Sequence, residues 1–294
     1  PDPHTVLKFL KTQGFKRLTA RFEAQKNNFD GIAELQNTDQ SETEKNYELI
    51  QEKDLLEKWL EEITKIGTVA FDTETDSLDA TQATLIGISL AIKNGKACYV
   101  PLRHNPSHQS SLLTDGTSAI KQIPFDEAIA LLKPMLEDPS ILKIGHNIKY
   151  DALVVQQIKN GSIRLKSVDD TMCLSYVLEG GLHGHGLNEL SELHFDHTNI
   201  KYKDVCGSGK SQISFAEVDV EKALDYAAED ADMTFRLHKK LKGMLARNKM
   251  TTVYETLERP LIPILTQMEN NGIKVDPLIL KTMSEDFSAR LENQ

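Results

Sequence analysis

Two acidic side chains alternate in the segment VAFDTET, residues 69–75. The segment has the composition of a β-strand, in which successive side chains point to opposite faces. Asp72 and Glu74 are therefore expected on one face and Phe71 on the other. Carboxylates that share a face can bind divalent cations. A strand end that emerges into solvent would also explain the pair, so other segments must supply further groups before a site is indicated.

A third acid lies on the apolar side of a helix predicted over residues 147–159. At about 100° per residue, Asp151 stands in the middle of an arc of apolar side chains. The arc comprises Ile148, Val154, Val155 and Ile158. Because an unpaired buried charge is costly, Asp151 must be protonated, paired with a cation or directed into a metal-filled cleft. A lysine or backbone donors that hold the carboxylate are the structural alternative.

A long helix, predicted from about residue 219 to 247, carries four acids close together. They are Asp225, Glu229, Asp230 and Asp232. The helical period places only Asp230 beside the apolar arc, and it places the other three on the outer side. Tyr226 precedes Asp230 by one turn, so its phenol could reach whatever Asp230 binds. An ordinary tyrosine at the edge of the core is the alternative interpretation of Tyr226.

The elements that must position these side chains follow from apolar periodicity and turn residues. We predict a short strand and a helix within residues 46–66, strands at 68–73, 83–92, 96–102 and 141–144, and helices at 124–137, 147–159, 170–178 and 219–247. Asp170 is the expected N-cap of its helix. Strands that come first in a meander and then alternate with helices indicate an α/β fold with a mixed sheet.

The composition is that of an ordinary globular protein, with 39% hydrophobic and 27% charged residues. A length of 294 residues leaves room for about two domains. The 34 basic and 44 acidic residues give a net charge of -10. This charge argues against a sequence-reading DNA-binding protein, which usually has a basic face. A metal-dependent nuclease stays open, because it concentrates carboxylates at its site and bound cations reverse the local field.

Cysteine usage and hydropathy predict the compartment. Cys98, Cys173 and Cys206 form no CxxC pair, which argues against a disulfide framework and a zinc knuckle and favours the cytoplasm. No apolar run approaches the roughly 18 residues of a membrane span, so no membrane partner is expected. The sequence starts at Pro1 without a leader, and we expect a piece of a longer protein.

Two weaker motifs are interpreted as structural. His183 and His185 lie in a glycine-rich loop and are followed by His194 and His197. No acidic or cysteine partner has a matching metal-ligand spacing, so these are expected to be loop or core histidines. Residues 207–211, GSGKS, end like a phosphate loop. The first glycine and the preceding apolar strand are missing, which indicates a chance match.

Taken together, the acidic motifs resemble those of the DEDD exonuclease superfamily, in its tyrosine-bearing branch. The motifs are Asp72-x-Glu74, Asn147-x-x-x-Asp151 and Tyr226-x-x-x-Asp230. The strings FDTETDSLD, NIKYD and YAAEDAD, with the flanks LIQEKD and ERPLIPIL, are similar to the proofreading domain of bacterial family A DNA polymerases, of the Klenow fragment type. Three such motifs in this order are a specific signal, and the resemblance extends from residue 47 to the C-terminus.

This resemblance implies a ribonuclease H-like fold, with a mixed β-sheet flanked by helices, and a two-metal 3'-5' exonuclease that releases nucleoside 5'-monophosphates from DNA. Asp72 is then expected to bridge both ions. Glu74 and Asp230 would hold the ion of the attacking water, Asp151 would act through the water shell of the second ion, and Tyr226 would orient the nucleophile. Two cations, Mg²⁺ or Mn²⁺ with Zn²⁺ as a further option, can stabilise the attacking and leaving oxygens of a phosphodiester. Such hard cations prefer oxygen ligands.

The resemblance also implies a single-stranded or frayed 3' end of DNA as the partner. The expected substrate-binding residues are Leu78, His146, Asn147, Met172 and Tyr202. Leu78 would wedge against the terminal base, Asn147 would contact the strand and Tyr202 would stack on a base. A family member has phenylalanine in place of Tyr202, which is conservative for stacking. It has glutamine in place of His146 and arginine in place of Gly184, differences that bear on strand binding and leave the chemistry unchanged.

Three units follow from the same resemblance. Residues 1–45 are expected to be a linker and the remnant of an upstream domain, 46–248 the exonuclease domain, and 249–294 the truncated start of a polymerase domain that acts in cis. A ribonuclease D-like RNA exonuclease shares all three motifs and is the main alternative. An inert scaffold domain of a polymerase is the second alternative, although all four acids and the tyrosine are present.

Overall fold

The computed structural model describes residues 3–13, 15, 18–19, 45–105, 120–159 and 162–292. Most of the predicted linker, residues 20–44, lies outside the described residues. The first described element is helix α1, Pro3–Thr12.

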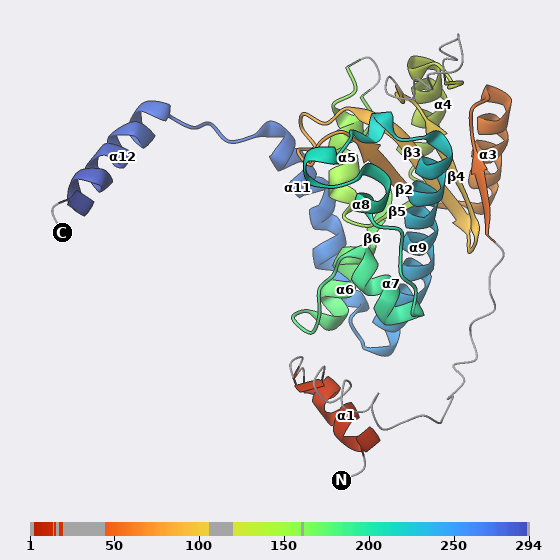
Figure 1. Cartoon of the computed structure of the whole chain (residues 1–294). Helices are drawn as coiled ribbons and strands as arrows, with labels where there is room; N and C mark the ends of the chain where they lie inside the picture. The colour runs from red at the N-terminus through yellow and green to blue at the C-terminus, as the bar shows by residue number, and fades with distance from the viewer. Residues whose placement is uncertain are drawn as a thin grey trace.

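A mixed sheet of six strands, in the order β1-β4-β3-β2-β5-β6, forms the centre of the fold (Figure 1). The strands are β1 (Asn46–Leu49), β2 (Thr68–Thr75), β3 (Leu85–Lys93), β4 (Lys96–Pro101), β5 (Leu142–Gly145) and β6 (Val168–Asp170). Strands β2, β3 and β4 pair antiparallel in chain order, which confirms the predicted meander. Strand β1 is parallel to β4, and β5 is parallel to both β2 and β6.

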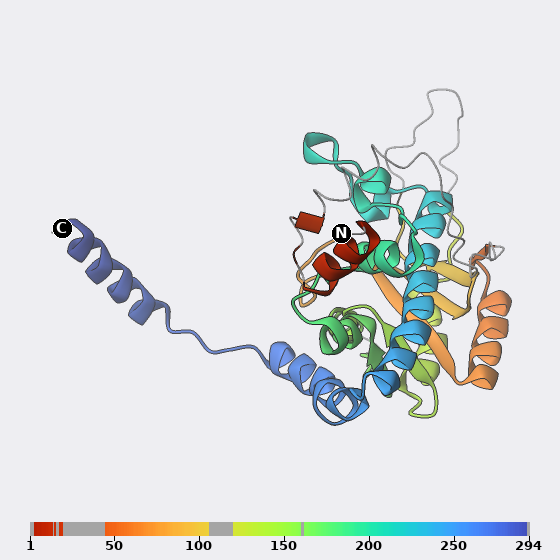
Figure 2. The same cartoon turned by 90° about the horizontal axis from the view of Figure 1, so that it is seen from below.

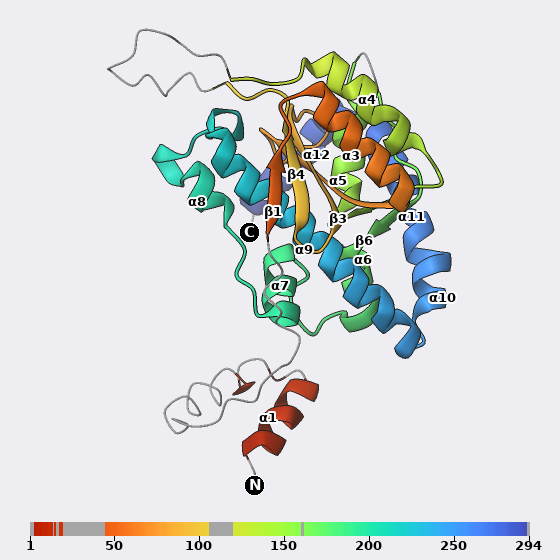
Figure 3. The ribbon, with the colours of Figure 1, turned by 90° about the vertical axis from the view of Figure 1, so that its right-hand side faces the viewer.

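Helices cover both faces of the sheet (Figure 3). On one face lie α3 (Lys53–Ile66), α4 (Phe125–Glu137) and α5 (Ile148–Gln156). Helix α9 (Val220–Arg247) crosses the other face and contacts strands β1 to β5. The side chains of β2 divide accordingly, since Val69 and Phe71 pack on the first face and Ala70 packs against α9. The predicted alternation of this strand is therefore confirmed.

Shorter helices pack around α9 and the sheet edge. They are α6 (Thr171–Glu179), α7 (Leu187–Phe195), α8 (Tyr202–Cys206) and α10 (Thr251–Val253), followed by a π-helical turn (Tyr254–Glu258) and α11 (Arg259–Asn271). The side chain of Asp170 accepts hydrogen bonds from the amides of Met172 and Cys173, which confirms it as the N-cap of α6. Strand β6 and helix α8, with three and five residues, were not predicted because they are too short to show a period.

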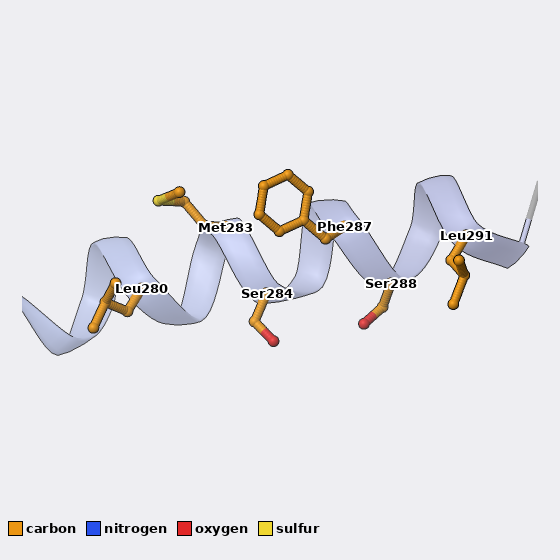
Figure 4. A pocket seen from close by; sticks show the side chains of 6 residues that line it. All are labelled: Leu280, Met283, Ser284, Phe287, Ser288 and Leu291. Atoms are coloured by element: carbon orange, nitrogen blue, oxygen red, sulfur yellow. The ribbon is translucent and has the colours of Figure 1, made fainter. Parts of the chain in front are cut away.

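Helix α12 (Pro277–Glu292) lies apart from the other described elements (Figures 1 and 2). Its residues are exposed along its whole length. A hollow on its surface is lined by this helix alone, by Leu280, Met283, Ser284, Phe287, Ser288 and Leu291 (Figure 4). It is therefore an open surface. Within the described part of the chain, no helix is both long and apolar enough to span a membrane.

Candidate active site

Strand β2 places Asp72 and Glu74 on the face covered by α9, because they share the alternation of Ala70. Asp72 is half-buried, whereas Glu74 is buried. Glu74 stands opposite Gly87 of β3. A Cβ at Gly87 would lie 2.0 Å from the hydroxyl oxygen of Tyr99, so glycine is needed for the Tyr99 ring to cross the strand beside Glu74.

Helix α5 brings Asp151 to the same strand. Its Oδ1 accepts a hydrogen bond from the Thr73 amide at 2.9 Å and another from the Thr73 hydroxyl at 2.6 Å. Asp151 is near both strand acids, because its charge adds to the causes that raise the pKa values of Asp72 and Glu74. The alternative of a backbone donor is thus correct for one oxygen of Asp151. Burial nevertheless raises the pKa of Asp151 to about 7, although the bonds from Thr73 lower it.

The start of α5 is fixed by Asp170, at the end of β6. Its carboxylate accepts hydrogen bonds from the amides of Asn147 at 3.1 Å and Ile148 at 2.9 Å. Asn147 has a left-handed backbone, with φ of 63°. This is a conformation that asparagine tolerates better than most residues. One N-cap therefore orders α6 and also aims the first turn of α5, which carries Asp151.

Helix α9 supplies Asp230 and Tyr226, one turn apart on the same side. After burial, the charge of Asp230 is the next cause that raises the pKa of the Tyr226 phenol, which therefore lies near this carboxylate. The side-chain amide of Asn199 donates to Asp230 Oδ1 at 3.2 Å. Sequence patterns did not point to Asn199, because it lies in a loop 31 residues before its partner.

The four acids lie close enough to repel one another. Burial is the main cause that raises the pKa of Glu74, and the charges of Asp72, Asp230 and Asp151 add to it. The pKa values of Asp72 and Asp230 are raised in the same way, by burial and then by a neighbouring acid. Glu74 Oε1 is buried and has no hydrogen-bond partner among the described residues. Such a cluster must bind protons or a cation to be stable.

The donor set fits a hard divalent cation. All four groups are carboxylates, and one buried oxygen of Glu74 is left without a donor, which is the chemistry that Mg²⁺ and Mn²⁺ prefer. No group of three or more His, Cys, Asp or Glu side chains in the described ranges is placed to hold a metal ion as it stands.

Two acids of α9 that were predicted on its outer side are buried instead. Glu229 is 2% exposed and Asp232 is fully buried. Asp232 accepts hydrogen bonds from the Gly95 amide at 2.8 Å and the Tyr47 hydroxyl at 3.0 Å. The prediction was wrong because a helical period identifies one apolar face, whereas α9 is covered by the sheet on one side and by α7 and α8 on others. Asp225 is exposed as predicted.

The predicted substrate residues occupy different surroundings. Leu78 follows β2 and is 98% exposed, and Asn147 is exposed. Tyr202, at the start of α8, is 40% exposed. Its ring stacks on Phe215 with the centroids 6.4 Å apart and meets the edge of Tyr226 at 6.3 Å. The structure therefore brings Tyr202 together with Tyr226, while Leu78 projects freely.

His146 and Met172 are half-buried. The His146 Nδ1 lies 2.8 Å from the hydroxyl of Thr171. Burial lowers the pKa of His146 to about 4, and its Nε2 is buried without a hydrogen-bond partner among the described residues. Met172 contributes its amide to the cap made by Asp170.

The other histidines have structural contacts. The rings of His185 and Tyr176 lie 3.7 Å apart, and His183 Nε2 lies 2.7 Å from Glu179. His197 Nε2 lies 3.0 Å from Glu229. These contacts agree with their interpretation as loop and core residues.

Comparison with known proteins identifies a family. Residues 47–246 match the model of a family described as 3'-5' exonuclease. The chain is 46% identical over 260 residues to DNA polymerase I of Rhizobium leguminosarum, a match that covers 84% of this chain and 25% of that protein. It is 36% identical over 252 residues to DNA polymerase I of Pseudomonas aeruginosa, covering 85% and 26%. The chain thus spans about a quarter of the length of these curated relatives.

Solved structures share the fold. The POL domain of Pol1 from M. smegmatis, in complex with DNA primer-template and dNTP, gives a TM-score of 0.61 at 20% identity and covers 84% of this chain and 36% of that chain. Brucella melitensis NrnC with bound Mg²⁺ gives 0.54 at 20% identity, covering 80% and 98%. Escherichia coli RNase D, an exoribonuclease, gives 0.54 at 18% identity, covering 76% and 51%. These likenesses confirm the predicted ribonuclease H-like fold.

Proposed function

The chain belongs to the 3'-5' exonuclease family, in the form found in bacterial DNA polymerase I, and from that premise we propose that it removes nucleoside 5'-monophosphates from the 3' end of DNA. The observation that supports this most directly is the convergence of four carboxylates from β2, α5 and α9. The cluster has a buried oxygen without a donor in the described part of the chain. This arrangement stores charge repulsion that a divalent cation relieves.

Asp72 would hold both of two ions, Glu74 and Asp230 one of them, and Asp151 the other through water. When bound, two divalent cations supply stabilisation of the attacking and leaving oxygens in an in-line displacement. The protein orients these ligands itself, since Thr73 fixes one oxygen of Asp151. Mg²⁺ or Mn²⁺ is expected from the oxygen-only donor set.

Tyr226 would orient the attacking water. Burial, followed by the charge of Asp230, raises the pKa of the Tyr226 phenol far above its ordinary value. The phenol therefore keeps its proton and serves as a hydrogen-bond donor. A group of this kind positions a nucleophile but does not act as its base.

The strand end would be held by stacking and by a wedge. Tyr202 is the exposed ring closest to Tyr226 in the aromatic cluster, so a base stacked on it would lie near the acids. Leu78 is free to contact the terminal base. Because a terminus must be splayed from a duplex to reach a buried centre, a frayed or single-stranded 3' end is the proposed substrate.

A polymerase domain in cis, and with it a proofreading role, is proposed from the curated relatives. A cytoplasmic location is proposed as well, since Cys98, Cys173 and Cys206 are all free. The RNA exonuclease alternative is supported by a likeness in fold to structures such as RNase D, whereas the relatives of higher identity are DNA polymerases.

One experiment tests the activity and the substrate together. Single-stranded DNA and RNA of one sequence, labelled at the 5' end, are incubated with Mn²⁺ or with excess chelator. We expect progressive shortening of the DNA from its 3' end and release of mononucleotides, and neither in chelator. Faster loss of RNA would favour the ribonuclease D-like alternative. Equal activity in chelator, or release from 5' ends, would overturn the proposal, and an inactive protein would support the scaffold alternative.

A further inference from the structure

Glu229 directly precedes Asp230 on α9, but its carboxylate points to a different part of the protein. It accepts a hydrogen bond from the Ile200 amide at 2.7 Å. Lys45 Nζ and His197 Nε2 each lie 3.0 Å from Glu229 Oε1. Glu229 therefore binds the segment between α7 and α8 at both residue 197 and residue 200.

Asn199 lies between these two anchor points. It is 3% exposed, and its side-chain nitrogen donates to Asp230 Oδ1 at 3.2 Å. The other amide atom, Oδ1, is buried and has no hydrogen-bond partner within the described ranges. The contact with Asp230 is thus the interaction that determines which way the buried amide faces, because a carboxylate oxygen accepts only from the nitrogen end.

The same segment leads directly into α8. Ile200 is bound by Glu229, and Tyr202 begins the helix two residues later. Helices α7 and α8 both pack against α9, on either side of this connection (Figure 3). Holding residues 197–200 in place therefore also holds the Asn199 amide, which donates to Asp230, and the backbone from which the Tyr202 side chain projects.

We propose that Glu229 and Asn199 are positioning residues of the exonuclease centre. Glu229 holds residues 197–200 on α9, and Asn199 in turn holds the carboxylate of Asp230 in the orientation that receives a divalent cation. This inference rests on the proposed function, and it adds two residues that the acidic motifs do not contain. Neither residue is expected to touch the cation or the scissile phosphate.

The physical basis is the restriction of Asp230 rotation. One oxygen of Asp230 is bonded to Asn199, which leaves the carboxylate fewer orientations. A metal ligand held in this way loses less conformational freedom when the ion binds. Removing the partner of a metal ligand typically weakens metal affinity or activity by about 10- to 100-fold.

The test compares Asn199→Ala and Glu229→Gln with two controls on α9. Asp225→Asn removes an exposed acid one turn before Glu229. Asp232→Asn removes a buried acid whose partners are Gly95, Tyr47 and Arg236. Mn²⁺ affinity is measured by calorimetry without DNA, melting temperature is measured in chelator, and kcat and KM are measured on single-stranded DNA.

For Asn199→Ala we expect Mn²⁺ binding about 10-fold weaker, with kcat lowered and KM for DNA little changed. For Glu229→Gln we expect weaker Mn²⁺ binding and also a raised KM for DNA. The backbone before Tyr202, the proposed stacking residue, would then be held less firmly. Asp225→Asn should resemble the wild type. Asp232→Asn should lower the melting temperature without changing Mn²⁺ affinity.

Variants at both positions that melt lower yet bind Mn²⁺ like the wild type would overturn the inference, since the contacts would then serve stability alone. Should Glu229→Gln fail to fold, Asn199→Ala decides, because it removes no charge. A wild-type protein that neither binds Mn²⁺ nor cleaves DNA would overturn the proposed function, and this inference with it. A wild-type protein that does both, with unchanged variants, would overturn this inference alone.

Discussion

Asp151 accepts two hydrogen bonds from Thr73 through a single oxygen, one from the amide and one from the hydroxyl. Thr73 occupies the one position of β2 that separates Asp72 from Glu74. Thr73 thereby holds Asp151 near the two strand acids, although Thr73 has no charge of its own with which to bind a cation. The second oxygen of Asp151 is left for other partners.

Replacing Thr73 with valine keeps the shape of the side chain and removes its hydroxyl, whereas serine keeps the hydroxyl. We expect Thr73→Val to lose about 1 kcal/mol of unfolding free energy in urea, as one buried hydrogen bond is lost. We also expect kcat to fall about 10-fold, because Asp151 is less well oriented. Thr73→Ser should keep most of the activity. A valine variant as active as the wild type would show that the amide alone positions Asp151.

Changing Tyr226 to phenylalanine should lower kcat far less than changing Asp72 or Asp230 to alanine. The phenylalanine variant loses one orienting hydrogen bond, typically worth about 10²-fold. The alanine variants lose a proposed ligand of the ions themselves. Single-turnover cleavage of DNA at saturating Mn²⁺ measures the difference. If Tyr226→Phe were as inactive as Asp72→Ala, the phenol would have a direct acid or base role.

Mn²⁺ binding should strengthen as the pH rises from 6 to 8 and should release protons. Burial raises the pKa of Asp151 to about 7, so at pH 6 this carboxyl is mainly protonated and a cation must displace the proton. Calorimetry in two buffers of different ionisation enthalpy gives the number of protons released. An affinity independent of pH across this range would mean that the acids are already ionised in the free protein.

Sequence periodicity gave correct predictions for the side chains of an element that packs against a single layer on each face. The alternation of β2 correctly placed Asp72 and Glu74 on the same face as Ala70, which packs against α9. The cap signal at Asp170 was also correct, although its second role, holding the Asn147 amide, joins residues that are 23 positions apart. A local pattern carries no information on such a contact.

The helical period wrongly predicted that Glu229 and Asp232 are exposed, because α9 is covered by other elements on more than one side. Both are acids outside the apolar arc of α9, and both are buried against polar partners from other segments. Asp232 also pairs with Arg236, one turn later on the same helix. A hydropathy pattern treats a charged residue as exposed unless its neighbours on the face are apolar. The charge of Glu229 is instead satisfied by the Ile200 amide, Lys45 and His197, and no sequence spacing relates these groups to it.

Asp72 bears on stability when no metal is bound. Burial, followed by the charge of Asp151, raises the pKa of Asp72 well above its ordinary value. An acid with a raised pKa binds more protons in the folded than in the unfolded protein. Its contribution is favourable below the ordinary carboxyl range, near pH 4, and is lost as the pH rises through the raised value. At pH 8 in chelator, ionising the cluster therefore destabilises the fold.

We accordingly predict that Asp72→Asn melts at a higher temperature than the wild type in chelator at pH 8. The gain in unfolding free energy should be on the order of 1 kcal/mol, as in sites that sacrifice stability for function. Because the asparagine removes a charge from the cluster, the gain should shrink as the pH is lowered towards 4. Adding Mn²⁺ should raise the melting temperature of the wild type and hardly change that of the variant. Calorimetric scans at several pH values, with and without Mn²⁺, measure all three effects. A metal-free variant that melts clearly below the wild type would show that donors of the protein already stabilise the Asp72 carboxylate, and the repulsion among the four acids would then be too weak to require a cation.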